Sequence, residues 1–409
     1  MHFKFLQMNV LKNIFRAAGK IVAAGALAFM LALAVTAVGP VYRFRPPQPF
    51  SGEDIFNPYA SLDTAQGWKR ANFHTHTRVK GPWPMNECPQ WPAYVDSAYR
   101  ALGYDIITFS NHNELTVHPY DSTLQVNVYE QGYSINKYHK LVFGSQKVIH
   151  WDPILYLTAS QKQWNLDYLG WSSDFIQMNH PYRTLGTCRS HMEKLSGYEI
   201  MELDTSVSTE NEYWDWALSA GHYSFGLAND DLHFPDKHWK IAIRCNFVQT
   251  PSGSYEDLKK ALLGGCYYAM RVPDYGNGDW TEKRARNHCL PKVENIGLHG
   301  STAFIKLSAV ADSIRVNGQD HATLSLVQAT DSLAYTFRPE DPYARFTAFF
   351  PDGEVIYSNP FARYDASAGA FPAPEGPQAV NWLLTVLYNL LLLAVMALLV
   401  RLILKLFRK

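Results

Sequence analysis

The sequence predicts an α/β fold with a mainly parallel sheet, followed by a small β-sandwich, and with one apolar helix at each end. Three observations support this fold class. Short apolar strands alternate with helical segments over residues 68–272, which is typical of βα units. Short strands separated by turns follow from Val293, with Asn317-Gly318 as a hairpin turn. Residues 21–38 and 382–404 are long apolar runs near the two ends.

The N-terminal apolar run, residues 21–38, is preceded by four basic residues and has the length that a bilayer requires. An uncleaved membrane anchor is one interpretation. A cleaved signal peptide with a small-residue site near Ala37 is the other. We favour the anchor, because the run is long for the apolar part of a signal peptide.

The C-terminal apolar run, residues 382–404, predicts a second transmembrane helix, with a packing helix as the alternative. Arg401 lies near the end of this run, and three further basic residues follow it: Lys405, Arg408 and Lys409. Because both basic clusters lie on the terminal sides, the positive-inside rule predicts that both termini are cytoplasmic. The region between the two runs is then extracytoplasmic, which we expect to be the periplasmic side.

Between the two apolar runs, apolar segments bounded by turn residues are assigned to strands, and longer amphipathic segments to helices. The expected strands of the first region are 72–77, 105–110, 141–144, 175–179, 198–203, 223–228, 241–248 and 266–270. The expected helices are 93–102, 161–169, 210–220 and 255–263, the last with Ser254 as its N-cap. Residues 274–292 are polar and rich in turns. The later strands are expected at 303–310, 313–316, 322–328, 334–338, 345–350 and 355–357.

These assignments divide the chain of 409 residues into consecutive parts. Residues 1–41 form a cytoplasmic tail and N-terminal anchor, and 42–67 a proline-rich stalk. Residues 68–272 form the first folded domain, and 273–365 the β-sandwich domain. Residues 366–379 are a linker, and 380–409 hold the C-terminal transmembrane helix and its basic tail.

Eight ligand-type side chains in the first domain predict a metal site. The pairs His74/His76 and Asp231/His233 are each two positions apart, so on a strand both members face the same side. Imidazole and carboxylate ligands together suit Zn²⁺, Mn²⁺ or Fe. Two hydrogen-bonded histidines on a strand are the alternative for His74 and His76. The remaining candidates, in or just after expected strands or in the loops beyond, are His112, Glu130, His139 and His180.

The ordered set of motifs resembles the PHP (polymerase and histidinol phosphatase) domain over residues 68–272. Residues 71–77 resemble its opening His-x-His motif, and 103–113 its second motif. Residues 179–181 resemble its His-Pro motif, and 226–233 its closing Asp-x-His. Glu130 and His139 match the bridging glutamate and the histidine that follows it. The resemblance implies a distorted seven-stranded β/α barrel with the site at one rim.

The resemblance also implies how the ligands are shared among ions. His74, His76, Glu130 and Asp231 would form one metal site, and Glu130, His139 and His180 a second. The third site of the family would keep only His112 and His233, because the chain has neither Asp nor His at 77–84 and has Asn111 in place of an Asp. We therefore expect two divalent transition-metal ions and a weak or empty third site, with Glu87 or Cys88 as alternative ligands for it.

The function that these features imply is a membrane-tethered metal-dependent hydrolase, most simply a phosphoesterase that uses a metal-activated water. Glu130 and Asp231 are the expected catalytic residues, together with Arg183, whose guanidinium suits a phosphate group. A surface role is the alternative for Arg183. Relatives of the PHP type also act on ester or amide bonds, so the bond type stays open. The competing hypothesis is a degenerate PHP-like scaffold or binding protein of the cell envelope.

The amino-acid composition limits the classes of substrate and partner that the chain is expected to bind. The formal net charge is zero, so the chain lacks the basic field that nucleic acid binding requires. A small-molecule or lipid and envelope phosphoester is the expected substrate, and no protein partner is indicated. The five cysteines show no CxxC spacing and leave disulfide pairing open.

Overall fold

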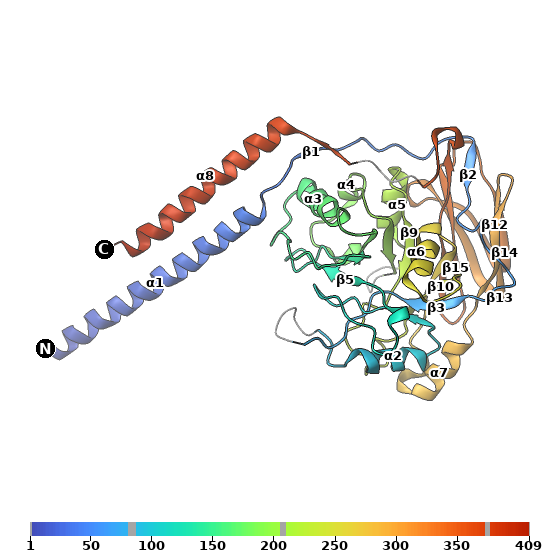
Figure 1. Cartoon of the computed structure of the whole chain (residues 1–409), viewed down its shortest axis with the longest axis horizontal. Helices are drawn as coiled ribbons and strands as arrows, with labels where there is room; N and C mark the ends of the chain where they lie inside the picture. The colour runs from blue at the N-terminus through green and yellow to red at the C-terminus, as the bar shows by residue number, and fades with distance from the viewer. Residues whose placement is uncertain (1, 81–86, 205–209, 373–376, 409) are drawn as a thin grey trace.

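The computed structural model is a mixed α/β structure with two long helices at its ends and two large sheets between them (Figure 1). It describes residues 2–80, 87–204, 210–372 and 377–408. One sheet has five strands and the other has eleven, and a two-stranded ladder lies beside the terminal helices.

The five-stranded sheet has the order β5-β6-β7-β8-β9. Its strands are β5 (Val128–Gln131), β6 (Lys140–Phe143), β7 (Phe175–Met178), β8 (Ile200–Leu203) and β9 (Phe225–Ala228). All of their residues are buried, as short continuous apolar runs predict. β7, β8 and β9 pair parallel, whereas β5, β6 and β7 pair antiparallel.

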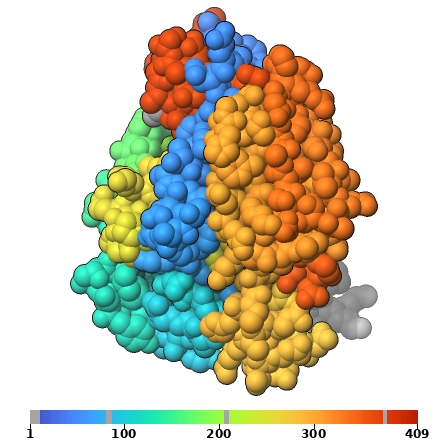
Figure 2. All heavy atoms as spheres, turned by 90° about the vertical axis from the view of Figure 1, so that its right-hand side faces the viewer, coloured from blue at the N-terminus to red at the C-terminus, as the bar shows by residue number. Residues whose placement is uncertain are grey.

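The eleven-stranded sheet joins the first domain to the later strands. Its main path is β12-β13-β15-β16-β11-β10-β3-β4. These strands are β12 (Val293–His299), β13 (Thr302–Asn317), β15 (Tyr343–Phe349), β16 (Val355–Ser358), β11 (Tyr267–Arg271), β10 (Arg244–Val248), β3 (Lys69–Asn72) and β4 (Ile106–Ile107). Off the path lie β14 (Thr323–Thr336), β17 (Phe361–Tyr364) and β2 (Asp54–Phe56). Residues that follow the first helix run along the outside of the molecule toward β2 (Figure 2).

The expected closed seven-stranded barrel is not formed by the described strands. β9 and β10 share no backbone ladder, because the side chain of Asn246 on β10 occupies the hydrogen-bonding groups of β9. This side chain accepts from the amide of Ala228 and donates to the carbonyl of Ala228, both at 2.9 Å. β4 and β5 meet only through an isolated bridge between His112 and Glu130. The mainly parallel sheet is also wrong, since β10 and β11 pair antiparallel with their neighbours.

The expected β-sandwich does not form two sheets of its own. β16 pairs with β11, so the strands after residue 292 continue the sheet that carries β10 and β3. The strands expected at 303–310 and 313–316 are one strand, β13, and those expected at 322–328 and 334–338 are β14. Without β16, one edge of β11 would carry unpaired backbone groups. Pairing with β16 satisfies these groups, which explains why the later strands continue this sheet.

Helices cover the outside of the two sheets. They are α2 (Pro92–Arg100), α3 (Ala159–Gly170), α4 (Arg189–Met192), α5 (Glu212–Ser219), α6 (Tyr255–Gly264) and α7 (Trp280–His288). Thr158 and Gln161 form a capping box at the start of α3, and Ser254 caps α6 as predicted. α7 lies in the stretch that was expected to be a loop, and the side chain of Asp279 caps it.

The terminal helices are α1 (His2–Thr36) and α8 (Trp382–Phe407). Leu11–Thr36 and Trp382–Phe407 are long and apolar enough to cross a membrane, and few of their residues are buried. The two helices leave the rest of the molecule side by side, and both chain ends lie at the same end of the molecule (Figure 1). Their inner ends are joined by a short ladder of β1 (Tyr42–Arg43) and β18 (Ala379–Val380).

Candidate metal centre

Two loops bring four of the predicted ligands to one point. His74 and His76 follow β3, and Asp231 and His233 follow β9. The loops run side by side, because Thr75 and Leu232 form a parallel bridge and the amide of His76 donates to the carbonyl of Leu232 at 2.9 Å. The i, i+2 spacing therefore places both pairs on one side, although His74 and His76 lie beyond the end of the strand.

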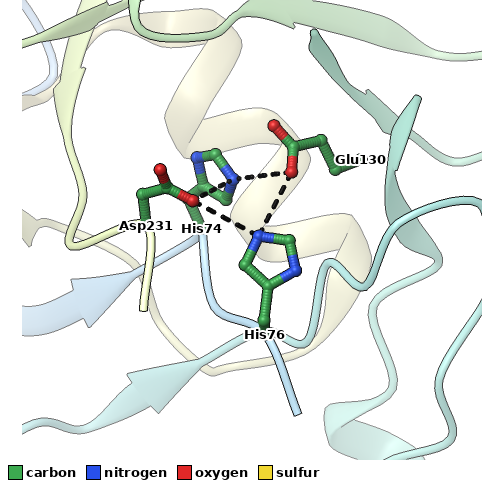
Figure 3. A group of neighbouring side chains, drawn as sticks. All are labelled: His74, His76, Glu130 and Asp231. Atoms are coloured by element: carbon green, nitrogen blue, oxygen red, sulfur yellow. Dashed lines mark ion pairs between the residues drawn. The ribbon is translucent and has the colours of Figure 1, made fainter. Parts of the chain in front are cut away.

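One carboxylate, that of Glu130 on β5, lies opposite Asp231 with His74 and His76 between them (Figure 3). Its Oε2 atom lies 3.2 Å from Nε2 of His74 and 3.1 Å from Nε2 of His76. Oδ1 of Asp231 closes the group, at 3.2 Å and 3.3 Å from the same two nitrogens. The four side chains therefore converge on one small volume, as ligands of a single ion do.

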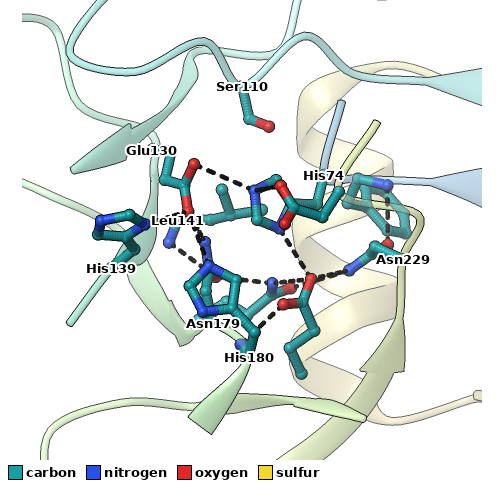
Figure 4. Close-up of polar contacts among 12 residues, drawn as sticks. His74, Ser110, Glu130, His139, Leu141, Asn179, His180 and Asn229 are labelled. Atoms are coloured by element: carbon teal, nitrogen blue, oxygen red, sulfur yellow. Dashed lines mark hydrogen bonds and ion pairs between the residues drawn. The ribbon is translucent and has the colours of Figure 1, made fainter. Parts of the chain in front are cut away.

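The other oxygen of Glu130 faces a second set of side chains (Figure 4). Oε1 lies 3.2 Å from Nδ1 of His139 and 3.3 Å from Nε2 of His180. It also accepts a hydrogen bond from Nδ2 of Asn179 at 2.9 Å. The two oxygens thus belong to two neighbouring groups, which is the arrangement of a carboxylate that bridges two ions.

A third group forms around Glu87, which the sequence offered only as an alternative. Oε2 of Glu87 lies 3.2 Å from Nε2 of His112, 3.6 Å from Nδ1 of His76 and 3.9 Å from Nδ1 of His233. His76 and His233 stack with ring centroids 4.4 Å apart. The expectation that only His112 and His233 remain at this position is therefore incomplete, because a carboxylate is also present. Cys88 is buried and its sulfur contacts the carbonyl of Gln90 instead.

Glu202 is a contributor that the sequence analysis missed. Its Oε1 lies 2.8 Å from Nδ1 of His74, and its Oε2 accepts from the backbone amide of His180 at 2.8 Å. A carboxylate bound to one imidazole nitrogen fixes the tautomer and turns the other nitrogen toward an ion. The signal in the sequence was a glutamate within the apolar strand β8, since a buried glutamate requires partners.

The buried charges of the cluster shift its pKa values strongly. Burial alone would raise the pKa of Glu130, but the imidazoles of His112, His74 and His139 lower it well below its usual range. Burial would likewise raise the pKa of Asp231, and His74 and His233 bring it well below its usual range. Both carboxylates are therefore anionic over the whole physiological pH range.

The imidazoles respond to the same charges. Burial alone would lower the pKa of His76, but the nearby carboxylates of Asp231 and Glu130 raise it to about 9. Burial lowers the pKa of His139 to about 3 despite the opposing effect of Glu130. Strong shifts of this kind, with a named charge partner in each case, are concentrated at functional sites.

The donor set fits a metal ion better than it fits a hydrogen-bond network. Within the described residues, Nε2 of His74 and Nε2 of His76 are buried and have no hydrogen-bond partner with acceptable geometry. Such unsatisfied buried groups are costly, on the order of 1–3 kcal/mol each. Both nitrogens lie between Glu130 and Asp231, so a cation at that point would satisfy both.

Backbone strain accompanies two of the candidate ligands. His180 has φ 25° and Asp231 has φ 50°, a region that non-glycine residues rarely adopt. Strain of this kind persists where the surrounding structure requires it, most often at functional sites. His180 is held in this conformation by the hydrogen bond that its backbone amide donates to Glu202.

A cavity of about 440 Å³ opens beside the cluster. Its walls include Asp231 and His233 on the metal-ligand side and Arg183, Trp239 and Arg244 on the other sides. Arg183 forms an ion pair with Asp231. The predicted phosphate-binding arginine therefore lies at the cluster, next to a space that a small substrate can enter.

Asn111 does not contact the cluster directly. Its Oδ1 accepts from the amide of Thr77 at 2.7 Å, and its Nδ2 donates to the hydroxyls of Thr77 and Thr116. It holds the loop that follows His76. The structure thus brings all eight predicted ligands and Arg183 together, and adds Glu87 and Glu202.

Comparison with known proteins gives remote structural likenesses. No protein-family model matches the chain, and no curated protein matches it. One similar solved structure is a two-domain protein containing a predicted PHP-like metal-dependent phosphoesterase from Bacteroides vulgatus. It is 15% identical with a TM-score of 0.39, and the match covers 78% of this chain and 99% of that chain.

A second similar structure is a lesion-specific endonuclease from Pyrococcus furiosus, 15% identical with a TM-score of 0.32. That match covers 48% of this chain and 56% of the endonuclease. Likenesses this remote carry no information on the substrate of the present chain.

Proposed function

We propose that this chain is a membrane-tethered, metal-dependent hydrolase that acts on phosphoesters. The observation that carries the proposal is the surroundings of Glu130. Five imidazole nitrogens lie within 3.3 Å of its two oxygens, and they belong to His74, His76, His112, His139 and His180. A carboxylate shared by so many imidazoles is typical of a multinuclear hydrolytic centre.

The residues that would hold the ions follow from the groups around the two oxygens. His74, His76 and Asp231 would hold one ion, and His139 and His180 a second, with Glu130 bridging them. Zn²⁺, Mn²⁺ and Fe²⁺ all suit this donor set. Bound ions would supply a water of lowered pKa and neutralise charge on the reacting group. A third ion would be held by His112, Glu87 and His233.

A phosphoester is favoured over other substrates by Arg183. The guanidinium reaches the cluster from the cavity side, and planar bidentate donors of this kind match phosphate oxygens. A substrate phosphate placed between Arg183 and the ligands would compete with Asp231 for the guanidinium. That exchange would free Asp231 to orient the attacking water.

The two apolar terminal helices limit which substrates can reach the site. Two apolar helices with basic outer ends support a site on the extracytoplasmic side. Small-molecule, lipid or envelope phosphoesters are the substrates within reach of such a site. The net charge of zero favours these over nucleic acid.

Activity of the full chain, purified in detergent and supplied with Zn²⁺, Mn²⁺ or Fe²⁺, tests the proposal. p-Nitrophenyl phosphate, bis(p-nitrophenyl) phosphate and p-nitrophenyl acetate separate phosphomonoester, phosphodiester and carboxylic ester hydrolysis. We expect metal-dependent turnover of a phosphoester that Glu130→Gln reduces to background, while His299→Ala on the exposed end of β12 leaves it unchanged. Metal binding without turnover of any ester would favour the degenerate scaffold.

A further inference from the structure

α3 carries an aromatic stripe on its outer face. Trp164, Tyr168 and Trp171 recur at intervals of four and three residues, so they lie on one side of the helix and its C-cap. Leu166 and Leu169 are buried on the side that faces the core. The helix thus carries apolar side chains on both sides, and on the outer side only Tyr168 of the three also packs against the core cluster.

Trp151 joins this stripe from the preceding loop. Its ring lies 6.3 Å from that of Trp164 and 5.6 Å from that of Tyr168, and the ring of Trp171 lies 5.3 Å from that of Trp164. The side chain of Trp171 is 69% exposed. We call Trp151, Trp164, Tyr168 and Trp171 the aromatic surface. Trp151, Trp164 and Tyr168 are half-buried beside it. An exposed indole that extends such an aromatic group marks a contact site.

The aromatic surface lies beside the inner ends of both terminal helices. A Cβ atom at Gly39, just after α1, would be 3.1 Å from the ring of Trp164. The hydroxyl of Tyr42 donates to Asp167 of α3 at 2.6 Å. Figure 1 shows α3 next to β1, where the two long helices leave the folded part. The position of α3 is therefore fixed relative to the helices.

The depth of this contact follows from Tyr388. α8 has 26 residues and is about 39 Å long at 1.5 Å per residue, which exceeds the hydrocarbon core of about 30 Å by about 9 Å. Tyr388 lies six residues after Trp382, about 9 Å along the helix. Its hydroxyl accepts from Gln161 of α3 at 3.5 Å and donates to the carbonyl of Ala37 at 3.0 Å.

Polar contacts hold this end of α8 against the segment that follows α1. Thr385 accepts from the amide of Val41, and Asn389 exchanges hydrogen bonds with the backbone of Gly39. Arg401 and Lys405 also require a polar environment at the other end, so the surplus length of α8 is shared between its two ends. Gln161, at the start of α3, therefore lies close to the boundary of the bilayer.

We propose that the aromatic surface is a membrane-contact surface, which lies in the headgroup region of the bilayer beside α1 and α8. Its occupant is the phospholipid interface, where Trp and Tyr rings are enriched because each has an apolar body and a polar group. The inference rests on the tethering part of the proposed function and is independent of the hydrolytic part. Its consequence is that the folded part lies against the membrane instead of moving freely on two stalks.

Fluorine NMR of the full chain tests this directly. The chain is labelled with 5-fluorotryptophan and reconstituted in phosphatidylcholine nanodiscs that contain a lipid with a gadolinium chelate on its headgroup. Trp→Phe substitutions assign the lines one at a time. We expect the lines of Trp151, Trp164 and Trp171 to broaden as strongly as that of Trp382. The indole introduced by Leu326→Trp, on exposed β14 at the opposite end of the molecule, should stay sharp.

Two outcomes overturn the proposal, and they are distinguishable. A sharp Trp171 line beside a broadened Trp382 line shows that the helix is inserted but the aromatic surface is away from lipid. Sharp lines for both show that the tether itself is wrong. As a second measurement, Trp171→Asp should sharpen the Trp151 line, whereas Trp171→Phe should leave it broadened. Equal effects of the two variants would also contradict contact with lipid.

Discussion

Glu202 contacts the imidazole of His74 on the side away from the proposed ions, with Oε1 of the carboxylate 2.8 Å from Nδ1 of His74. This contact leaves Nε2 of His74 facing Glu130 and Asp231. The second oxygen of Glu202 binds the backbone amide of His180. One buried carboxylate therefore orients ligands of both proposed ions without touching either position itself.

Glu202→Gln tests this positioning role. The amide keeps the shape of the side chain but no longer stabilises the required tautomer, so metal affinity should fall about 10–100-fold while the chain stays folded. Competition with a chromogenic chelator measures the affinity. Glu199→Gln, at the neighbouring turn before β8, is the matched control and should leave it unchanged. An unaltered affinity for Glu202→Gln would show that the contact with His74 is not needed to bind metal.

Glu87→Gln and Cys88→Ser form a second pair. Oε2 of Glu87 lies within reach of His112, whereas the sulfur of Cys88 turns toward Gln90. Glu87→Gln should remove the weakest-bound ion and leave the ions at Glu130 in place, because Glu87 supplies the carboxylate of the group that it forms with His76 and His112. Cys88→Ser should retain all of them. Titration calorimetry with Mn²⁺ resolves the stoichiometry, and a full set of ions in Glu87→Gln would exclude Glu87 as a ligand.

Asp215→Ala should destabilise the fold strongly. Asp215 of α5 is buried and accepts from Nε of Arg345 on β15 at 2.8 Å, so its removal leaves a buried guanidinium without its carboxylate. The expected loss in the free energy of unfolding is about 3–5 kcal/mol. Urea denaturation of the full chain in detergent measures it. Asp312→Asn, on the exposed side of β13, should change it by less than about 0.5 kcal/mol.

The same pair gives a pH dependence with a definite sign. Burial alone would raise the pKa of Asp215, but Arg345 lowers it below the ordinary 3.8. A carboxyl group whose pKa is lowered by folding stabilises the protein above its unfolded pKa, and this contribution is lost as the pH falls through the folded pKa. The difference in stability between the native chain and Asp215→Asn should therefore shrink as the pH falls below about 4. A difference that grows as the pH falls below about 4 would contradict the pairing.

Membrane topology is tested with reporter fusions after Gln378 and after Lys409. Basic residues at both outer ends predict that the folded part is extracytoplasmic and that both termini are cytoplasmic. Alkaline phosphatase should be active at the first junction and inactive at the second. Activity in the reverse pattern would overturn the orientation, and with it the envelope substrate.

Much of the fold could be predicted from the sequence because it depends on local patterns. Buried strands such as β7 and β8 are short apolar runs, and α6 begins at its predicted cap, Ser254. Sheet closure could not be predicted in this way. It depends on whether β9 finds a backbone partner, and here the side chain of Asn246 replaces one. α7 was missed because a helix on the surface carries little apolar signal.

The candidate site was predicted where ligand residues have a fixed spacing, as for His74 and His76. Glu130 was placed by its position among the motifs and not by a fixed spacing to another ligand, and it lies in β5 and is 1% exposed. Glu202 and Glu87 depend on contacts between segments far apart in the sequence. Such contacts are set by the tertiary structure, so no local pattern reveals them.

Metal content of the purified full chain is the most direct test of the central claim. After loading with Zn²⁺, Mn²⁺ or Fe²⁺ and removal of free ions, elemental analysis should find at least two ions per chain. The variant with His74→Ala and His76→Ala should lose at least one of them, since both Nε2 atoms face the same point between Glu130 and Asp231. A chain that retains no ion under any of these conditions, while folded, would contradict the account of a metal-dependent hydrolase.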